Sequence, residues 1–392
     1  EPLVSIEQLR VEFQTGDGVV VGVKDVSFNI KPGECVCVVG ESGSGKSVSS
    51  LSLMRLVEFG GGTIAGGRLM FEKDDGQVVD LAAQSGAAMR DIRGNQIGMI
   101  FQEPMTALNP VFTVGDQLVE GLIAHRGLKK AEARARALEI LRQVRIPEPE
   151  RRLDQYPHEL SGGMRQRVVI AIAMACEPRL LICDEPTTAL DVTIQAEILA
   201  LIDRLKREKQ IAVLFITHDM AVVAQMADRV VVMYRGAKVE EGPVEQIFET
   251  PREDYTKMLL AAVPRLGEMT GKPAPERLRL MGDGTQGAPE PIIVADPKPL
   301  LTVRNLTTRF SVKGGVLRRT VAHVHAVEDV SFTINSGETL SLVGESGCGK
   351  STCGRSILRL VEPESGQVDL GGTDILALSQ RALRRARRDM QM

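Results

Sequence analysis

Short apolar runs and longer segments of helical spacing alternate along the chain. Apolar runs of strand length occupy Cys35 to Val39, Leu180 to Cys183 and Ile211 to Thr217. Helical spacing is found over Ser47 to Val57 and over Leu128 to Val144. Strands that alternate with helices in this way predict an α/β fold built on a mainly parallel sheet.

The chain repeats part of its own sequence. Residues 23–47 read VKDVSFNIKPGECVCVVGESGSGKS and residues 327–351 read VEDVSFTINSGETLSLVGESGCGKS, with 16 of 25 positions identical at an offset of 304. This offset indicates a duplicated domain, because solenoid repeats recur every 20–50 residues. Residues 263–299 are rich in proline, glycine and polar residues, which predicts a linker. We therefore expect a complete domain at residues 3–262 and the first part of a second domain at residues 300–392.

Composition narrows the function. A net charge of -3 and a hydrophobic content of 43% are typical of a globular protein and give no reason to expect nucleic-acid binding. The basic run from Arg381 to Arg388 is interpreted as a solvated helix face. No signal peptide and no apolar stretch of roughly 20 residues is visible, so membrane association would have to be peripheral. The six cysteines fit no zinc or disulfide pattern and are expected to be buried thiols in a reducing compartment.

A glycine-rich motif follows the first apolar strand. It fits the phosphate-binding loop G-x-x-x-x-G-K-S, whose backbone N–H groups and following helix attract phosphate. Lys46 would reach the β- and γ-phosphates of a nucleotide, and the hydroxyls of Ser47 and Ser351 would bind Mg²⁺. The first copy comprises Gly40, Glu41, Ser42, Gly43, Ser44, Gly45, Lys46 and Ser47, and the second comprises Gly344, Glu345, Ser346, Gly347, Cys348, Gly349, Lys350 and Ser351.

Two carboxylates end the apolar strand that begins at Leu180. Phosphoryl transfer needs positioning and charge stabilisation more than covalent help. Asp184 is therefore expected in the Mg²⁺ shell, and Glu185 is expected to polarise the attacking water. An ordinary acidic turn is the alternative interpretation of this pair.

A second anion site is predicted farther along the chain. Ser161, Gly162 and Gly163, in LSGGMRQ, precede an apolar helix expected over Val168 to Ala175. A nucleotide has only one γ-phosphate. A second anion site in the same domain therefore suggests that this second site binds a nucleotide held by another domain.

LSGGMRQ, placed before the Asp184–Glu185 strand, resembles the signature of ABC transporter ATP-binding subunits. The stretches FQEPMTALNPVFTVGDQ, YPHELSGGMRQRV and DEPTTALDVTIQAEIL resemble the peptide, nickel and glutathione importers, and the tandem copies resemble the glutathione-importer ATPases. The resemblance covers nearly all of residues 3–262 and 300–392. It implies a P-loop ABC ATPase fold with a mainly parallel core, an antiparallel β subdomain and a helical subdomain at about residues 105–177.

The resemblance also implies roles for single residues. Gln102, in FQEP, resembles the Q-loop glutamine that contacts Mg²⁺ and water, and His218, in FITHD, resembles the switch histidine at the γ-phosphate. Ala189-Leu190-Asp191 resembles the D-loop, which places Asp191 at the nucleotide. Glu185, His218 and Gln102 are therefore the expected catalytic residues, and Ser47, Gln102, Asp184 and Ser351 the expected Mg²⁺ ligands.

Two phenylalanines occupy the positions of the aromatic residue that stacks on adenine. They are Phe13 in the first copy and Phe310 in the second. The alternative interpretation is that each is an ordinary core phenylalanine.

As a member of this family the chain would hydrolyse ATP with Mg²⁺ and drive solute import at the cytoplasmic face of the cell membrane. The implied partners are two transmembrane permease subunits, a periplasmic or extracellular solute-binding protein and a second ABC domain in cis or in trans. No cysteine lies between Glu185 and Gly347, so no iron–sulfur cluster is expected. The second copy contains a phosphate loop but no signature or Asp–Glu pair, which suggests part of a longer protein.

Two other functions would use some of the same motifs. A tandem ABC protein acting on ribosomes would join its domains by a long charged helix, whereas residues 263–299 are rich in proline and glycine. A nucleotide-binding protein without catalysis is disfavoured for the first domain by Glu185 and His218. For the chain as a whole, nucleotide binding without catalysis is the alternative interpretation.

Overall fold

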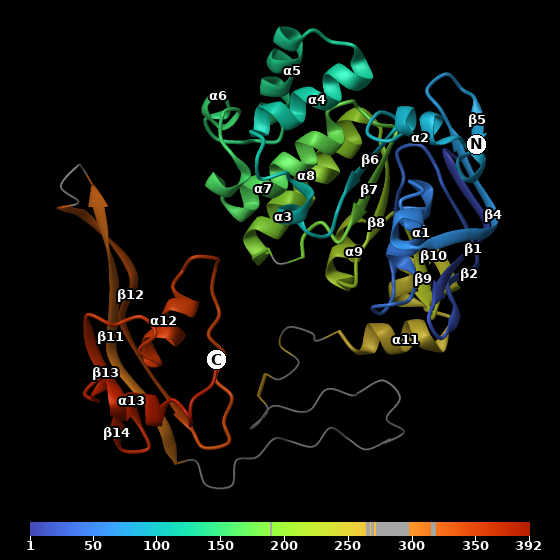
Figure 1. The fold of residues 1–392 in the computed structure, drawn as a ribbon. Helices are drawn as coiled ribbons and strands as arrows, with labels where there is room; N and C mark the ends of the chain where they lie inside the picture. Colours follow the sequence, from blue (N-terminus) through green and yellow to red (C-terminus); the bar gives the residue numbers. More distant parts are fainter. Residues whose placement is uncertain (189, 264–266, 268–269, 272–297, 315–318) are drawn as a thin grey trace. The chain divides into compact units, whose positions relative to one another are not determined.

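The computed structural model describes residues 1–188, 190–263, 267, 270–271, 298–314 and 319–392. They belong to two compact units, one running up to residue 263 and one containing residues 298–392 (Figure 1). Most of the linker predicted at 263–299, and Ala189 of the predicted D-loop, lie outside the described residues. The described residues form two sheets in the first unit and one in the second, and each unit has apolar clusters of its own.

In the first unit, helices separate the parallel strands of the core, as the apolar pattern predicts. The strands are β1 (Val4–Thr15), β2 (Gly18–Ile30), β3 (Cys35–Val39), β4 (Gly62–Glu72), β5 (Val78–Asp80), β6 (Ile97–Ile100), β7 (Leu180–Asp184), β8 (Ala212–Ile216), β9 (Arg229–Tyr234) and β10 (Ala237–Pro243). The helices are α1 (Lys46–Leu53), α2 (Gly86–Ile92), α3 (Pro104–Ala107), α4 (Val114–Arg126), α5 (Lys130–Gln143), α6 (Pro149–Arg152), α7 (Gly162–Met174), α8 (Val192–Lys209), α9 (Met220–Met226), α10 (Val244–Glu249) and α11 (Asp254–Ala261).

A six-stranded sheet with the order β10-β9-β3-β8-β7-β6 forms the core of this unit. Its neighbouring strands pair in parallel, except that β10 pairs antiparallel with β9 at one edge. Successive residues of β3 enter different apolar clusters: Cys35, Cys37 and Val39 belong to one, and Val36 and Val38 to the other. Both faces of the sheet are therefore covered, which explains why these strands read as continuous apolar runs.

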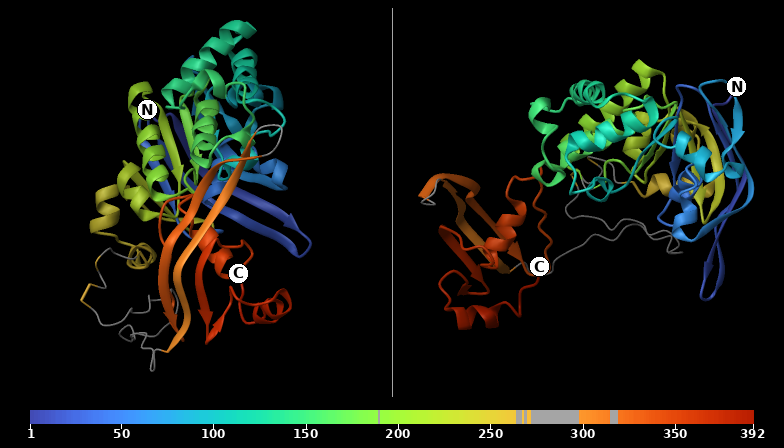
Figure 2. Two further views of the ribbon diagram at one scale, coloured as in Figure 1. Left: turned by 90° about the vertical axis from the view of Figure 1, so that its left-hand side faces the viewer. Right: turned by 45° about the horizontal axis from the view of Figure 1, so that its top comes forward.

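A separate antiparallel sheet has the order β2-β1-β4-β5. Its long β1–β2 hairpin projects from the body of the first unit (Figure 2). Helices α4, α5 and α6 gather on the opposite side of the unit (Figure 1). The fold class predicted from the sequence, a parallel core with an antiparallel and a helical part, is confirmed.

Two helices differ in extent from the sequence expectation. Helix α1 ends at Leu53 and not at Val57, because Arg55 adopts a left-handed backbone conformation with φ of 48°. Helix α7 begins at Gly162, well before Val168, because the Ser161 hydroxyl accepts a hydrogen bond from the Met164 N–H and caps it. The first turns of α7 contain polar residues, so the apolar pattern predicted a start that was too late in the sequence.

The second unit contains β11 (Pro299–Gly314), β12 (Arg319–Asn335), α12 (Lys350–Ile357), β13 (Ser365–Leu370), β14 (Thr373–Asp374) and α13 (Gln380–Ala386). Its sheet, β12-β11-β13-β14, repeats the connectivity of the antiparallel sheet in the first unit. The counterpart of β3, residues 339–343, is not a strand, and Leu340, Leu342 and Val343 are exposed. In the first unit β8 and β9 flank β3, and the described part of the second unit contains no counterpart of either strand.

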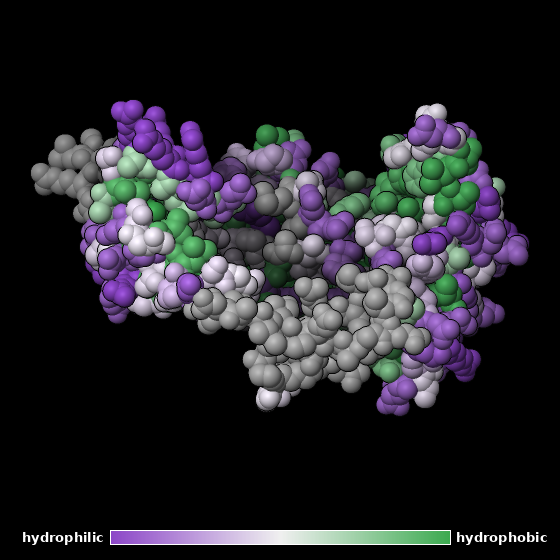
Figure 3. Space-filling model, turned by 90° about the horizontal axis from the view of Figure 1, so that it is seen from below, coloured by the Kyte–Doolittle hydropathy of each residue, from purple (hydrophilic) through white to green (hydrophobic). Residues whose placement is uncertain are grey.

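The coloured residues in Figure 3 are largely hydrophilic, with some patches of hydrophobic residues among them. Within the described ranges, every helix is too short or too polar to cross a bilayer.

Candidate functional site

The first phosphate loop joins the carboxyl end of β3 to the start of α1. Gly40 and Gly45 adopt φ values of 149° and 95°, which disfavour other residues. A side chain on Gly40 would also approach the Met233 carbonyl oxygen to 2.1 Å, so glycine is needed there on two counts. The loop therefore curls in front of the amino end of α1, where free backbone N–H groups attract anions.

Lys46 is the first residue of α1 and is only 6% exposed. Its Nζ donates hydrogen bonds to the carbonyl oxygens of Gly40 at 2.8 Å and Glu41 at 2.7 Å. Burial lowers the pKa of the ammonium, and the charges of Glu185 and Asp184 oppose this shift. The cation is thus held inside the loop, with two carboxylates near enough to influence its charge.

Ser47 and Asp184 meet where Mg²⁺ was expected. Ser47 Oγ donates a hydrogen bond of 2.9 Å to Asp184 Oδ1, although 137 residues separate them. Asp184 is 6% exposed, and burial raises the pKa of its carboxyl. Hydroxyl and carboxylate oxygens are ligands that Mg²⁺ prefers, and this ion uses one or two protein groups together with phosphates and water. The residues present therefore fit the ion.

Three polar side chains contact Glu185, two of them from the ends of neighbouring strands and one from its own turn. Glu185 Oε2 accepts hydrogen bonds from Gln102 Nε2 at 3.2 Å and Thr188 Oγ1 at 3.1 Å. His218 Nδ1 lies 3.0 Å from Oε1. Gln102, Glu185 and His218 follow β6, β7 and β8, and parallel strands bring their carboxyl ends to one edge of the sheet. The structure thus unites the three residues expected to be catalytic.

The backbone of Glu185 is strained. Its φ of 46° is left-handed, which costs a non-glycine residue about 1 kcal/mol or more. The Glu185 N–H is bonded to the Ile216 carbonyl at 2.9 Å, which fixes this conformation. Such strain is found at functional sites, where the surrounding structure holds a side chain in a set direction.

The signature residues Ser161, Gly162 and Gly163 lie with Asp191 in a second cluster of expected nucleotide-binding residues. Ser161 and Gly162 are exposed at the amino end of α7, and Asp191 Oδ1 caps α8 by accepting a bond from the Ile194 N–H at 2.9 Å. Gly163 packs beside Ile194, so the amino ends of α7 and α8 are neighbours. The hydrogen bonds of Ser161 and Asp191 stabilise their own helices, and a role of these residues at a nucleotide stays a prediction.

The expected adenine-stacking residues differ in their surroundings. Phe13 is half-buried, and its ring packs over Gly22 and Gly62 against an apolar cluster of the first unit. This packing supports a core role for Phe13. Phe310 is 43% exposed. Adenine stacking by either ring stays a prediction.

The second phosphate loop has the same shape as the first. Gly344 and Gly349 adopt φ values of 155° and 98°, close to those of Gly40 and Gly45. Lys350 Nζ donates to the carbonyl oxygens of Gly344 at 2.7 Å and Glu345 at 2.6 Å, as Lys46 does in the first loop. The two phosphate loops therefore fold in the same way, although residues 339–343 before the second loop form no strand.

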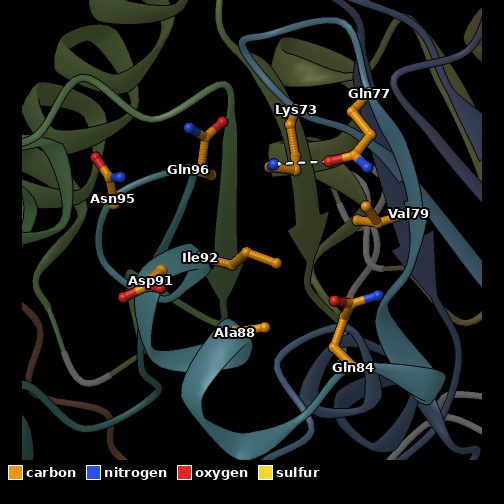
Figure 4. A pocket seen from close by; sticks show the side chains of 9 residues that line it. All are labelled: Lys73, Gln77, Val79, Gln84, Ala88, Asp91, Ile92, Asn95 and Gln96. Carbon is orange, nitrogen blue, oxygen red and sulfur yellow. Dashed lines mark hydrogen bonds between the residues drawn. The ribbon is translucent and has the colours of Figure 1, made fainter.

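A pocket of about 310 Å³ lies elsewhere in the first unit (Figure 4). Lys73, Gln77, Asp91 and Gln96 help to line it. Gln96 immediately precedes β6, and its carbonyl accepts a bond from the N–H of Arg179, just before β7. The pocket is therefore near the amino ends of these strands, opposite to Asp184, and it is not the nucleotide site.

Sequence reasoning missed several residues that contact the site. Thr188 bonds to Glu185, and the Tyr255 hydroxyl accepts a hydrogen bond from the Glu41 N–H at 3.2 Å. Gln166, which is fully buried, donates to the Pro186 carbonyl at 2.5 Å and so ties α7 to the turn after β7. Thr188 lies within a quoted motif and could have been found there. Tyr255 is 214 residues from Glu41, and no local pattern connects them.

Comparison with known proteins identifies relatives of this chain. The chain is 52% identical over 394 residues to the glutathione import ATP-binding protein GsiA of Pectobacterium atrosepticum, covering 100% of this chain and 63% of that protein. It thus spans less than two thirds of the length of this relative. A dimeric structure of MJ0796, a bacterial ABC transporter cassette, matches with 30% identity and a TM-score of 0.54, over 62% of this chain and 98% of that one. A post-hydrolysis structure of the same cassette, bound to ADP and Pi, matches equally well.

Two family models also match. The model for the oligopeptide/dipeptide transporter C-terminal region matches residues 239–283. The model named ABC transporter matches residues 23–188 and 327–392, which is more than half of the sequence. The resemblance found in the motifs is therefore confirmed, and the chain belongs to the ABC transporter family.

Proposed function

We propose that the first unit binds Mg-ATP and hydrolyses it to ADP and phosphate. The observation that carries this proposal is the placement of Glu185 between Gln102 and His218, beside the loop that holds Lys46. The likeness to a cassette solved with ADP and Pi supports it. In contrast, a purely nucleotide-binding role would give no reason to gather Gln102 and His218 around Glu185.

The phosphate loop binds and orients the nucleotide. Backbone N–H groups of residues 43–47 would surround the phosphates, and Lys46 would exchange its bonds with the loop carbonyls for bonds with phosphate oxygens. Ser47 and Asp184 would hold Mg²⁺, which neutralises charge on the phosphate oxygens when bound. Since Ser47 and Asp184 already lie 2.9 Å apart, little rearrangement is needed.

Glu185 would then accept a hydrogen bond from the attacking water and orient it toward the γ-phosphate. Gln102 and Thr188 fix one carboxylate oxygen, and His218 lies at the other. The His218 side chain is 64% exposed, so it can turn toward a γ-phosphate that enters the site.

We further propose that hydrolysis energises the import of a solute such as a peptide or glutathione. The match of residues 239–283 to an oligopeptide/dipeptide transporter region and the identity to GsiA support this class of cargo. The partners would be two transmembrane permease subunits and a periplasmic or extracellular solute-binding protein. The chain would then act as a peripheral protein at the cytoplasmic face of the membrane.

The exposed amino end of α7 suggests that two ABC domains complete each site together. The first loop would need a signature from another domain, and the second unit supplies none within residues 298–392. Two chains can meet this need by pairing their first units, and the similar MJ0796 cassette has been solved as a dimer. We therefore expect the rate of phosphate release per chain to rise with protein concentration, in parallel with a dimer seen by sedimentation.

Mixing two inactive variants tests this arrangement directly. Lys46→Ala disables a phosphate loop, and Ser161→Arg disables a signature. Neither should hydrolyse ATP alone, whereas an equal mixture should recover up to roughly a quarter of the parental activity, because mixed pairs contain one intact site. Strong turnover by a strictly monomeric chain, or no recovery in a mixture that forms mixed pairs, would contradict the composite site.

The dependence on Mg²⁺ is the simplest test of the proposed reaction. Phosphate release should require Mg²⁺ and stop when the ion is removed with a chelator. If the paired chain neither binds nor hydrolyses ATP with Mg²⁺ present, the proposed function is wrong.

A further inference from the structure

Helix α11 reaches back to the first phosphate loop. Its Tyr255 hydroxyl accepts the hydrogen bond from the Glu41 N–H, at 3.2 Å. On the other side of the same residue, the Glu41 carbonyl oxygen accepts a hydrogen bond from Lys46 Nζ at 2.7 Å. Both polar backbone groups of Glu41 are thus held, one by the loop's own lysine and one by a helix distant in sequence.

The ring of Tyr255 is placed by its neighbours. It packs on Tyr234, the last residue of β9, with ring centroids 4.3 Å apart and an angle of 36°. Just after Tyr234, the Gly236 N–H donates a hydrogen bond to the Ser44 carbonyl at 3.1 Å. The β9–β10 turn is therefore bonded to the same phosphate loop. Burial raises the pKa of the Tyr255 hydroxyl, which stays protonated and neutral at physiological pH.

The start of α11 is fixed as well. Glu240, on β10, is 6% exposed, and its carboxylate accepts bonds from the N–H groups of Arg252 at 2.9 Å and Glu253 at 3.1 Å. Burying a carboxylate is unfavourable unless it is well hydrogen-bonded, so these contacts fix the backbone just before the helix. Glu240 therefore anchors α11 to the sheet, and Tyr255 connects α11 to the phosphate loop.

We propose that Tyr255 is a positioning residue of the first nucleotide site, where its hydroxyl keeps Glu41 and the phosphate loop in the shape that binds polyphosphate. The proposal rests on the proposed function of the loop. Without this bond the Glu41 N–H would face solvent and the loop would gain freedom that nucleotide binding must remove. Tyr255 does not touch Glu185, Gln102 or His218, so its loss should weaken binding and leave the chemical step unchanged.

The test compares two hydroxyl deletions in one stacked pair. Tyr255→Phe removes the hydroxyl that bonds to Glu41, whereas Tyr234→Phe removes the other hydroxyl of the pair and serves as the matched control. Both are made in the full chain carrying Lys350→Ala, which silences the second loop. Titration with a fluorescent ATP analogue should show affinity about two- to tenfold weaker for Tyr255→Phe, the range expected for one hydrogen bond. Affinity of Tyr234→Phe should equal that of the parent.

Steady-state kinetics give a second measurement. Tyr255→Phe should raise KM for ATP and keep kcat, and thermal melting without nucleotide should show that the fold is retained. Equal affinity of Tyr255→Phe and the parent, or an equal loss in both variants, would overturn the inference while leaving the proposed function standing. A parent that binds no ATP analogue would contradict the proposed function, and this inference with it.

Discussion

Glu185→Gln should reduce ATP hydrolysis by roughly 100-fold or more while Mg-ATP binding is retained, since a positioned general base typically contributes a factor of this size. Glutamine keeps the shape of the side chain and can still bond to Thr188, but it lacks the charge that polarises water. The left-handed backbone at this position is kept, because the Ile216 carbonyl still accepts the bond from the N–H of residue 185. Binding of a labelled ATP analogue and single-turnover phosphate release separate the two effects.

An exposed glutamate provides the control for this substitution. Glu120→Gln, on the solvent face of α4, removes the same charge far along the sequence from the site and should leave both measurements unchanged. If Glu185→Gln hydrolyses ATP at the parental rate per site, Glu185 is not the residue that activates water.

Lys46→Ala is expected to have the second large effect. The ammonium would make charge-assisted bonds to the β- and γ-phosphates, so ATP affinity at the first site should fall by about ten- to a hundredfold. The fold should persist, because burial already disfavours this cation and the Glu41 carbonyl keeps the hydrogen bond that it accepts from the Ser44 N–H at 3.2 Å. Calorimetric titration with ATP measures the loss, and thermal melting checks the fold.

Lys350→Ala is the matched variant in the second loop, where the lysine makes the same carbonyl bonds. Lys46→Ala should remove the nucleotide bound at the first loop, and Lys350→Ala should remove the nucleotide bound at the second loop. Unchanged ATP affinity of a folded protein carrying both substitutions would show that neither loop is the nucleotide site.

Local motifs, together with the resemblance to ABC ATPases, predicted most of the residues that the structure brings together around Glu185. Gln102, Glu185 and His218 follow three apolar strands, and the parallel sheet brings those ends together. The pairing of Ser47 with Asp184 required only that both lie at this edge. The positions of β3, β7 and β8 were also predicted, since burial on both faces leaves a continuous apolar run.

Other features depend on contacts that the local sequence does not encode. The end of α1 is set by the left-handed conformation of Arg55, which no glycine or proline announces. Tyr255 reaches Glu41 through the packing of α11 against β9, and this depends on Glu240 holding the preceding turn. The exposure of residues 339–343 depends on which neighbouring strands are present, so the same motif forms a strand in one unit and none in the other.

The second phosphate loop contains a cysteine where the first contains a serine, and this difference has a practical consequence. Cys348 takes the place of Ser44 and is exposed, whereas Cys35, Cys37, Cys176, Cys183 and Cys353 are buried. The Cys348 sulfur lies 3.5 Å from Lys350 Nζ, beside the position that phosphate would take. A maleimide fluorophore should therefore attach at one natural position in the folded chain. Occupancy of the second loop could then be followed optically, apart from the first, without engineering any cysteine.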